Sequence, residues 1–349
     1  MQTSTPTFEE DAPVPRARFD FVPLLLIPLV ALVGLALVRN PQTWITLTIA
    51  GVGMGFVIFL TASGLTLVFG LMGVMNFGHG VFITLGAFLG GYMFWPSVAP
   101  LVACWCRADN LALNLMSIAV AAAVGMASTA VIALMYERIV MRACYGRPMI
   151  TQILLTVSMM FVLEQLMIVV LGGGTRLLMP TALQGSIVRG DVAIEKYRLL
   201  TLVLGVLIFI AITLVLNRTK IGSLIRASVE HRDVVEAMGY RVKHLFVAVF
   251  TVAAALAALG GLFWGMYQGV AGVTMGGRML TPIFIVLIIG GLGSITGACV
   301  AAILVGLLTN YVGYVFPLWT AFSTLILLFI VGFWRPQGLY PVSSDRAAL

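Results

Sequence analysis

The chain has 349 residues, of which 9% are charged and 61% are hydrophobic. A soluble domain carries roughly 25% charged residues, so this composition excludes an ordinary water-soluble protein. The net charge of +7 does not indicate nucleic-acid binding, because the basic residues are scattered between apolar runs. Such a distribution is typical of residues that orient transmembrane helices in the membrane. The sequence predicts an all-α, polytopic transmembrane helical bundle.

About ten apolar segments succeed one another, and a membrane-spanning helix needs about 20 apolar residues. They cover residues 21–38, 44–71, 76–95, 112–136, 149–171, 199–216, 245–268, 279–292, 295–313 and 318–334. We expect about eight to ten spans, with broken or re-entrant helices at 44–71 and in the pair 279–292 and 295–313. One transmembrane domain then covers 21–340. The polar segment 1–20 is predicted to be disordered, and 341–349 form a tail.

Basic residues predict the orientation, because loops on the cytoplasmic side carry an excess of Lys and Arg. The loop at 217–244 is the richest, with Arg218, Lys220, Arg226, Arg232, Arg241 and Lys243. We therefore expect this loop and both termini in the cytoplasm, and the loop at 172–198 on the outer side. The outer loop contains an Arg-Gly-Asp turn between short β-prone runs, which predicts a small hairpin.

Glycines inside the apolar runs cost roughly 1 kcal/mol each relative to alanine in a helix. One group recurs every four residues, a spacing that favours close helix packing. Its members are Ala253, Ala257, Gly261, Gly265 and Gly269, and Gly86 and Gly90 begin a shorter stripe.

The glycines of 67–82 keep no single spacing and cluster around Asn76 and His79. Polar groups in hydrocarbon are costly and often mark pathways. Asn76 and His79 either bind a neighbouring helix, or the segment from Asn76 to Gly80 is an unwound turn that faces a solute path. Residues 68–78 also align with 288–298 at a fixed offset, either by chance or as a trace of an internal repeat.

Glu164 is the only acidic residue well inside an apolar segment. A buried carboxylate needs a partner, for which His79, Asn76 or the backbone are the candidates. Glu164 is either a structural clamp or part of a solute route.

The loop at 217–244 predicts a surface helix of about ten residues. Ser228 is the expected N-cap, and Gly239 the expected C-cap. Val234, Val235 and Met238 would form its apolar edge. The helix either rests on lipid headgroups or docks into a groove of a soluble partner.

Taken together, several stretches resemble the permease subunits of branched-chain amino acid type ABC importers. The strongest are GLTLVFG at 64–70, GVMNFGHG at 73–80, RA at 226–227, EAMG at 236–239, GGLGSITG at 290–297 and RPQGL at 335–339. Residues 136–138, 146–148 and 156–164 also fit, and the likeness covers about 43–340. The chain departs from the commonest importers in lacking a full Glu-Ala-Ala in the loop. It also has Val157 where many relatives carry glycine.

The resemblance implies a bacterial inner-membrane subunit that is not itself an enzyme and holds no cofactor. Energy would come from two separate ATP-binding cassette ATPases, since no GxxxxGK[ST] motif occurs in the chain. A second homologous permease and a periplasmic binding protein would complete the assembly. The residues expected to couple to the ATPase are Arg226, Val234, Val235, Glu236, Ala237, Met238 and Gly239. The substrate stays open between branched-chain amino acids, other amino acids, and urea or short amides.

The sequence offers fewer residues for two other classes of function. A stand-alone secondary transporter or channel, for a solute such as urea, usually needs ionisable residues in its spans, and only Glu164 and His79 qualify. A membrane enzyme needs a nucleophile with its base or a metal cluster. The four cysteines and three histidines show no such spacing, so no metal site is expected.

Overall fold

The computed structural model describes residues 21–230 and 232–341, so the predicted disordered segment 1–20 and the residues after 341 lie outside it. The helices are α1 (Leu26–Val38), α2 (Pro41–Met72), α3 (His79–Gly91), α4 (Pro100–Arg107), α5 (Leu111–Tyr136), α6 (Arg142–Cys144), α7 (Met149–Leu171), α8 (Lys196–Arg218), α9 (Lys220–Glu230), α10 (Arg232–Ala237), α11 (Val242–Gln268), α12 (Met275–Gly290), α13 (Ile295–Val315) and α14 (Thr320–Trp334). Short helical turns cover Pro23–Leu25, Tyr92–Phe94, Glu137–Met141, Thr181–Leu183 and Pro317–Trp319. The strands are β1 (Gly174–Arg176), β2 (Ser186–Arg189), β3 (Val192–Glu195) and β4 (Val270–Gly272).

Seven of the described helical segments are long and apolar enough to cross a membrane. They are Pro41–Gly70, Leu111–Cys144, Met149–Leu171, Lys196–Arg218, Val242–Gln268, Ile295–Val315 and Pro317–Trp334. Three shorter apolar helices, Pro23–Val38, His79–Phe94 and Met275–Gly290, fall on the remaining predicted segments. The all-α polytopic bundle is therefore confirmed.

The break expected within 44–71 was wrongly placed. Helix α2 runs without interruption from Pro41 to Met72 and ends where Gly73 adopts a φ of +62°. The chain is then non-helical until α3 begins at His79. We call residues 73–78 the break. Its position follows from the left-handed conformation of Gly73, which ends a helix at little steric cost.

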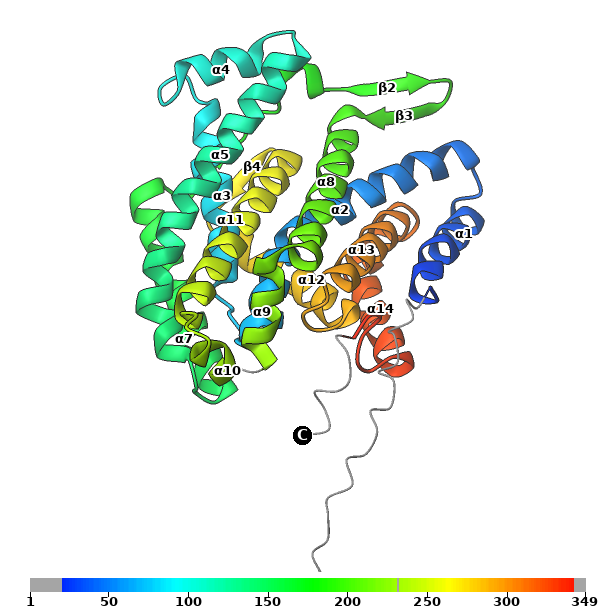
Figure 1. Cartoon of the computed structure of the whole chain (residues 1–349). Helices are drawn as coiled ribbons and strands as arrows, with labels where there is room; N and C mark the ends of the chain where they lie inside the picture. The colour runs from blue at the N-terminus through cyan, green and yellow to red at the C-terminus, as the bar shows by residue number, and fades with distance from the viewer. Residues whose placement is uncertain (1–20, 231, 342–349) are drawn as a thin grey trace, which may run out of the picture.

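Helices α2, α3, α11, α12 and α13 form the centre of the bundle, where most of their residues are buried. Helices α1, α7, α8 and α14 lie around them (Figure 1). These outer helices expose large apolar side chains such as Val169 and Phe333. A helix that is apolar on its exposed face suits contact with lipid or with another membrane subunit.

The small-residue stripe on α11 makes the predicted close contacts over most of its length. Gly64 of α2 lies against the Ala253 carbonyl, and Gly261 lies against the carbonyl of Ile83 in α3. Gly269 is the exception, because it ends α11 with a φ of +71° and has no neighbour within 4 Å of where a Cβ would be. The stripe is thus confirmed as a packing surface that stops one turn earlier than predicted.

The two long loops lie at opposite ends of the bundle (Figure 1). Strands β2 and β3 form the predicted hairpin, in which Arg189 pairs with Val192 around Gly190 and Asp191. Strand β1 pairs with β4, which attaches the beginning of this loop to the link between α11 and α12. Helices α9 and α10 lie at the other end, with the lower part of α7.

The α11 stripe generates a test of packing. Gly261→Leu should destabilise the protein by about 1–3 kcal/mol or more, because the new side chain meets the Ile83 carbonyl, which cannot move aside. Gly332→Leu on α14 is the matched control, since open space surrounds that glycine. Thermal unfolding in detergent should show a lower midpoint for Gly261→Leu alone. Equal midpoints for the two variants would contradict the packing described.

Candidate functional site

The backbone of the break is held by side chains of α7. The Met75 N–H donates to Gln152 Oε1 at 3.3 Å, and the Phe77 N–H donates to Thr156 Oγ1 at 3.2 Å. Gln152 and Thr156 are four residues apart, so they lie on one face of α7. Sequence reasoning missed Gln152, although the spacing of two polar residues at i and i+4 in an apolar helix was the available signal.

Asn76 is fully buried in the break. Its Oδ1 accepts a hydrogen bond from the Tyr136 hydroxyl of α5 at 3.2 Å, while its Nδ2 has no partner among the described residues. Gly78 makes room for this contact, because a Cβ there would collide with the Tyr136 hydroxyl. The break therefore presents one uncommitted donor inside the bundle.

His79 and Gly80 both serve packing between helices. His79 Nε2 lies 3.2 Å from the Thr61 carbonyl of α2, and since a carbonyl only accepts, Nε2 carries the proton. Gly80 lies against the backbone of Gly276, so that α3 approaches α12 closely. His79 thus binds a neighbouring helix, which is the first of the two interpretations of the sequence.

Glu164 lies on α7 with 9% of its surface exposed. The predicted partners were wrong: none of the described residues is hydrogen-bonded to its carboxylate, while Asn76 and His79 bind Tyr136 and Thr61. Its Oε1 instead faces Gly277, where a Cβ would stand 3.3 Å away. Gly277 is in the first turn of α12, and the positive end of a helix dipole favours a carboxylate there. This arrangement was not readable from spacing along the chain.

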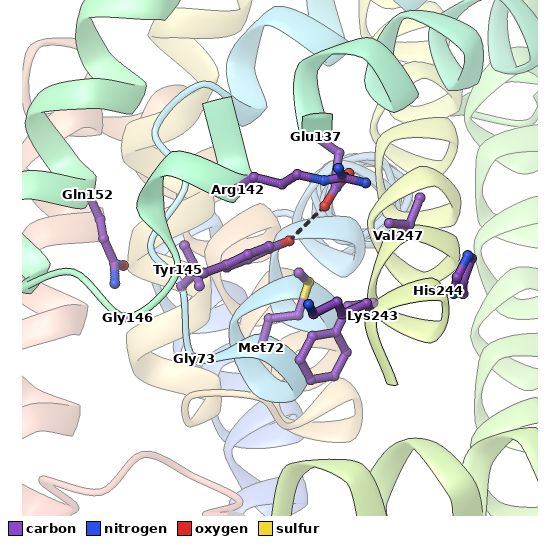
Figure 2. A pocket seen from close by; sticks show the side chains of 12 residues that line it. Met72, Gly73, Glu137, Arg142, Tyr145, Gly146, Gln152, Lys243, His244 and Val247 are labelled. Atoms are coloured by element: carbon purple, nitrogen blue, oxygen red, sulfur yellow. Dashed lines mark hydrogen bonds and ion pairs between the residues drawn. The ribbon is translucent and has the colours of Figure 1, made fainter. Parts of the chain in front are cut away.

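A cavity of about 610 Å³ opens beside Gly73 and Val74, where the break begins, and we call it the break cavity (Figure 2). Four segments line it: the end of α2 with Gly73 and Val74, the turn region 137–146, Gln152 of α7, and the start of α11. A second cavity, of about 820 Å³, lies between α2, α12, α13 and α14, and Gln268 and Arg278 are among its lining residues. It is on the side of the β1–β4 pair, so the two cavities lie toward opposite ends of the bundle.

Within the break cavity, Glu137 is almost completely buried, with 2% of its surface exposed. The Tyr145 hydroxyl donates to Glu137 Oε1 at 3.3 Å, and Arg142 Nε lies 3.5 Å from Oε2 (Figure 2). Burial, and then the nearby carboxylate, raise the pKa of Tyr145 well above its ordinary value. The phenol therefore stays protonated and acts as a donor to Glu137.

The surface helix expected from Ser228 begins elsewhere. Helix α9 starts at Lys220, where Thr219 Oγ1 accepts from the Gly222 N–H at 3.2 Å. Ser228 is inside α9, and its hydroxyl donates to the Leu224 carbonyl at 2.7 Å, so it is not the N-cap. The segment is therefore two helices, α9 and α10.

The end of α10 is as predicted, but its apolar edge is not. Gly239 has a φ of +88°, and the Tyr240 N–H donates to the Val235 carbonyl at 3.2 Å in a C-terminal cap. Val234 and Met238 are 57% and 69% exposed, whereas Val235 is 3% exposed and packs inward. Glu236 and Ala237 are exposed beside them. The outward apolar surface here is Val234 of α10 together with Met238, the residue that follows α10.

Arg226 takes part in a contact within the chain. Its Nη1 donates to the Leu216 carbonyl at 2.7 Å and to Asn217 Oδ1 at 3.2 Å. It thereby binds the last turn of α8 to α9, a contact that sequence reasoning did not foresee.

Comparison with known proteins assigns the family. The model of the family described as "Branched-chain amino acid transport system / permease component" matches residues 47–331. The chain belongs to this family of transport permeases. It is 26% identical to the high-affinity branched-chain amino acid transport system permease protein BraD of Pseudomonas aeruginosa, over 83% of this chain and 93% of BraD.

The corresponding LivH permease of Escherichia coli is 25% identical over 83% of this chain and 92% of LivH. A probable LivH permease of Methanocaldococcus jannaschii is 29% identical over 36% of this chain and 38% of that protein. No solved structure matches. The family membership and the apolar helices together make this chain a multi-pass membrane component of a transport system rather than an enzyme.

The support of the break by α7 is testable. Thr156→Val keeps the shape of the side chain but leaves the Phe77 N–H without an acceptor, which should cost about 1–3 kcal/mol. Ser158→Ala, on the exposed side of the same helix, should cost little. Thermal unfolding of both variants in detergent checks the difference. A Thr156→Val protein as stable as Ser158→Ala would show that α7 does not support the break.

Proposed function

We propose that this permease is the membrane-spanning subunit of an ATP-driven importer, with residues 21–340 as its transmembrane domain. It forms the path for branched-chain amino acids or related small polar solutes that a periplasmic binding protein delivers. Two ATP-binding cassette ATPases dock on the cytoplasmic side and bind the ATP, and a second homologous permease lies beside this one. The termini and the 217–244 loop are cytoplasmic, and the hairpin β2–β3 faces the binding protein.

The observation that carries this proposal is the exposed pair of Val234 in α10 and Met238 directly after it. Val234 and Met238 point away from the bundle, although α10 lies in a loop rich in basic residues. Short amphipathic helices of this kind bind by placing apolar side chains in a groove of a partner. Met238 and Val234, flanked by Glu236, Ala237 and Gly239, fit such a groove on the ATPase.

For the solute path we propose the region around the break. Asn76, His79, Gly80 and Glu164 come from the break, α3 and α7, and their neighbours lie on α2, α5 and α12. Asn76 Nδ2 and the Glu164 carboxylate are polar groups without a hydrogen-bond partner among the described residues. Such groups inside a membrane protein favour a place on a solute route.

The proposal is tested by uptake into proteoliposomes that contain the permeases, with the ATPases and the binding protein supplied. Uptake of leucine should require the ATPases and ATP. Met238→Glu should leave ATP hydrolysis in place but abolish the uptake linked to it, because a charge cannot enter an apolar groove. Gly239→Pro should do the same, since proline cannot adopt a φ of +88°.

Ser223→Glu is the matched control, because it adds the same charge on the exposed face of α9, outside α10. It should retain coupled uptake. Coupled uptake that is unchanged in Met238→Glu and Gly239→Pro would rule out α10 as the docking helix. Uptake without any ATPase, driven by an ion gradient, would favour the stand-alone transporter, for which the unpaired Glu164 is the relevant feature.

Glu164 gives a separate prediction. Glu164→Gln removes the negative charge beside the first turn of α12, and if the carboxylate is on the route the uptake rate should fall about tenfold, equivalent to about 1.4 kcal/mol in the barrier. Gln165→Ala, on the exposed side of α7, is the control. Initial uptake rates and thermal unfolding are measured on both. Normal uptake together with a lower unfolding midpoint for Glu164→Gln would assign the residue a structural role.

A further inference from the structure

The break cavity contains charged groups of both signs together with an apolar wall. Glu137 comes from the turn after α5, Arg142 from α6 and Lys243 from the start of α11. Met72, Val74, Phe246 and Val247 supply apolar surface. In Figure 2 the side chains of Glu137, Arg142 and Tyr145 come together on one side of the cavity, and Lys243 comes from the other.

Glu137 is incompletely satisfied by the protein. Oε1 accepts the Tyr145 hydrogen bond, but Oε2 has only the 3.5 Å ion pair with Arg142 and no hydrogen bond among the described residues. A carboxylate oxygen buried without a hydrogen bond is unfavourable unless a donor reaches it. An ammonium group offers three donors and an opposite charge, so it suits this position.

The two cations of the cavity are suited to a carboxylate. No described residue accepts a hydrogen bond from the Lys243 side chain, and Arg142 reaches Glu137 only through Nε at 3.5 Å. The cavity volume of about 610 Å³ lies in the range of small-molecule sites, which are mostly apolar with a few placed polar groups. A zwitterionic head with an apolar side chain matches this set of groups.

We propose that the break cavity binds a free α-amino acid with a branched apolar side chain. Its ammonium group meets Glu137, its carboxylate meets Lys243 and Arg142, and its side chain lies against Met72, Val74 and Val247. This rests on the proposed function, which it deepens. A neutral solute such as urea gains nothing from separated opposite charges, so the cavity selects the amino-acid class of substrate and places a binding step at the cytoplasmic end of the route.

The test uses the full chain in phosphatidylcholine nanodiscs, with His244→Cys as a reporter, because His244 lines the cavity and is exposed but makes none of the proposed contacts. Cys104 is the exposed native cysteine among the described residues and is replaced by alanine. L-leucine should slow labelling of the reporter by a polar maleimide about threefold once its concentration is about twice its Kd. 4-Methylpentanoate, which lacks the ammonium group, 3-methylbutylamine, which lacks the carboxylate, and urea should not slow it.

Glu137→Gln and Lys243→Gln should each abolish the protection by leucine. Arg147→Gln, an exposed charge on the same segment that does not line the cavity, should retain it. Lys243 is exposed, so its variant decides the matter even if Glu137→Gln fails to fold. Protection by leucine that persists in Lys243→Gln would overturn the proposal. Protection by phosphatidylglycerol in the nanodisc, and none by leucine, would make the cavity a lipid-headgroup site and would also overturn it.

The outcome is separable from the proposed function. Leucine uptake driven by ATP in the complete assembly, without leucine protection in the isolated chain, would reject the cavity site and leave the importer standing. Protection in the isolated chain without ATP-driven uptake would reject the importer and leave the binding site standing.

Discussion

A backbone amide inside a membrane has no water to bind, so a chain that leaves the helical conformation there needs other partners. The break at 73–78 meets this requirement through α7, where Gln152 and Thr156 accept from the Met75 and Phe77 amides. The same two hydrogen bonds fix α7 to the break. They also determine where Asn76 lies and where the break cavity opens, so the proposed route depends on them.

The glycines around the break are explained by separate contacts rather than by one stripe. Gly70 lies against Gly293, Gly78 against Tyr136 and Gly80 against Gly276, while Gly73 supplies the left-handed turn. Each contact is with backbone or with a ring, which a Cβ would disturb. Gly70 and Gly293 also bring the last turn of α2 into contact with the α12–α13 link, where Gly291 and Gly293 have positive φ. The two segments that align in the sequence therefore meet in space.

The contacts of α9 suggest how movement of α10 would reach the bundle. Val235 of α10 packs inward, and Arg226 of α9 binds the last turn of α8. A displacement of α10 by a partner would therefore act on α8, which lies at the surface of the bundle. Arg226 serves this arrangement as a positioning residue inside the chain, while Val234 and Met238 remain available to a partner.

The sequence by itself determined the helical class, the apolar segments, the β2–β3 hairpin and the turn at Gly239, because each depends on neighbouring residues and on the apolarity of a membrane. It also marked Asn76, His79 and Glu164 as unusual, since polar residues in such segments are costly. Their partners were decided only by the tertiary structure. Tyr136, Thr61 and Gly277 are far from them in the chain, and helix packing alone brings them together. Lys243 meets Glu137 and Arg142 in one cavity for the same reason.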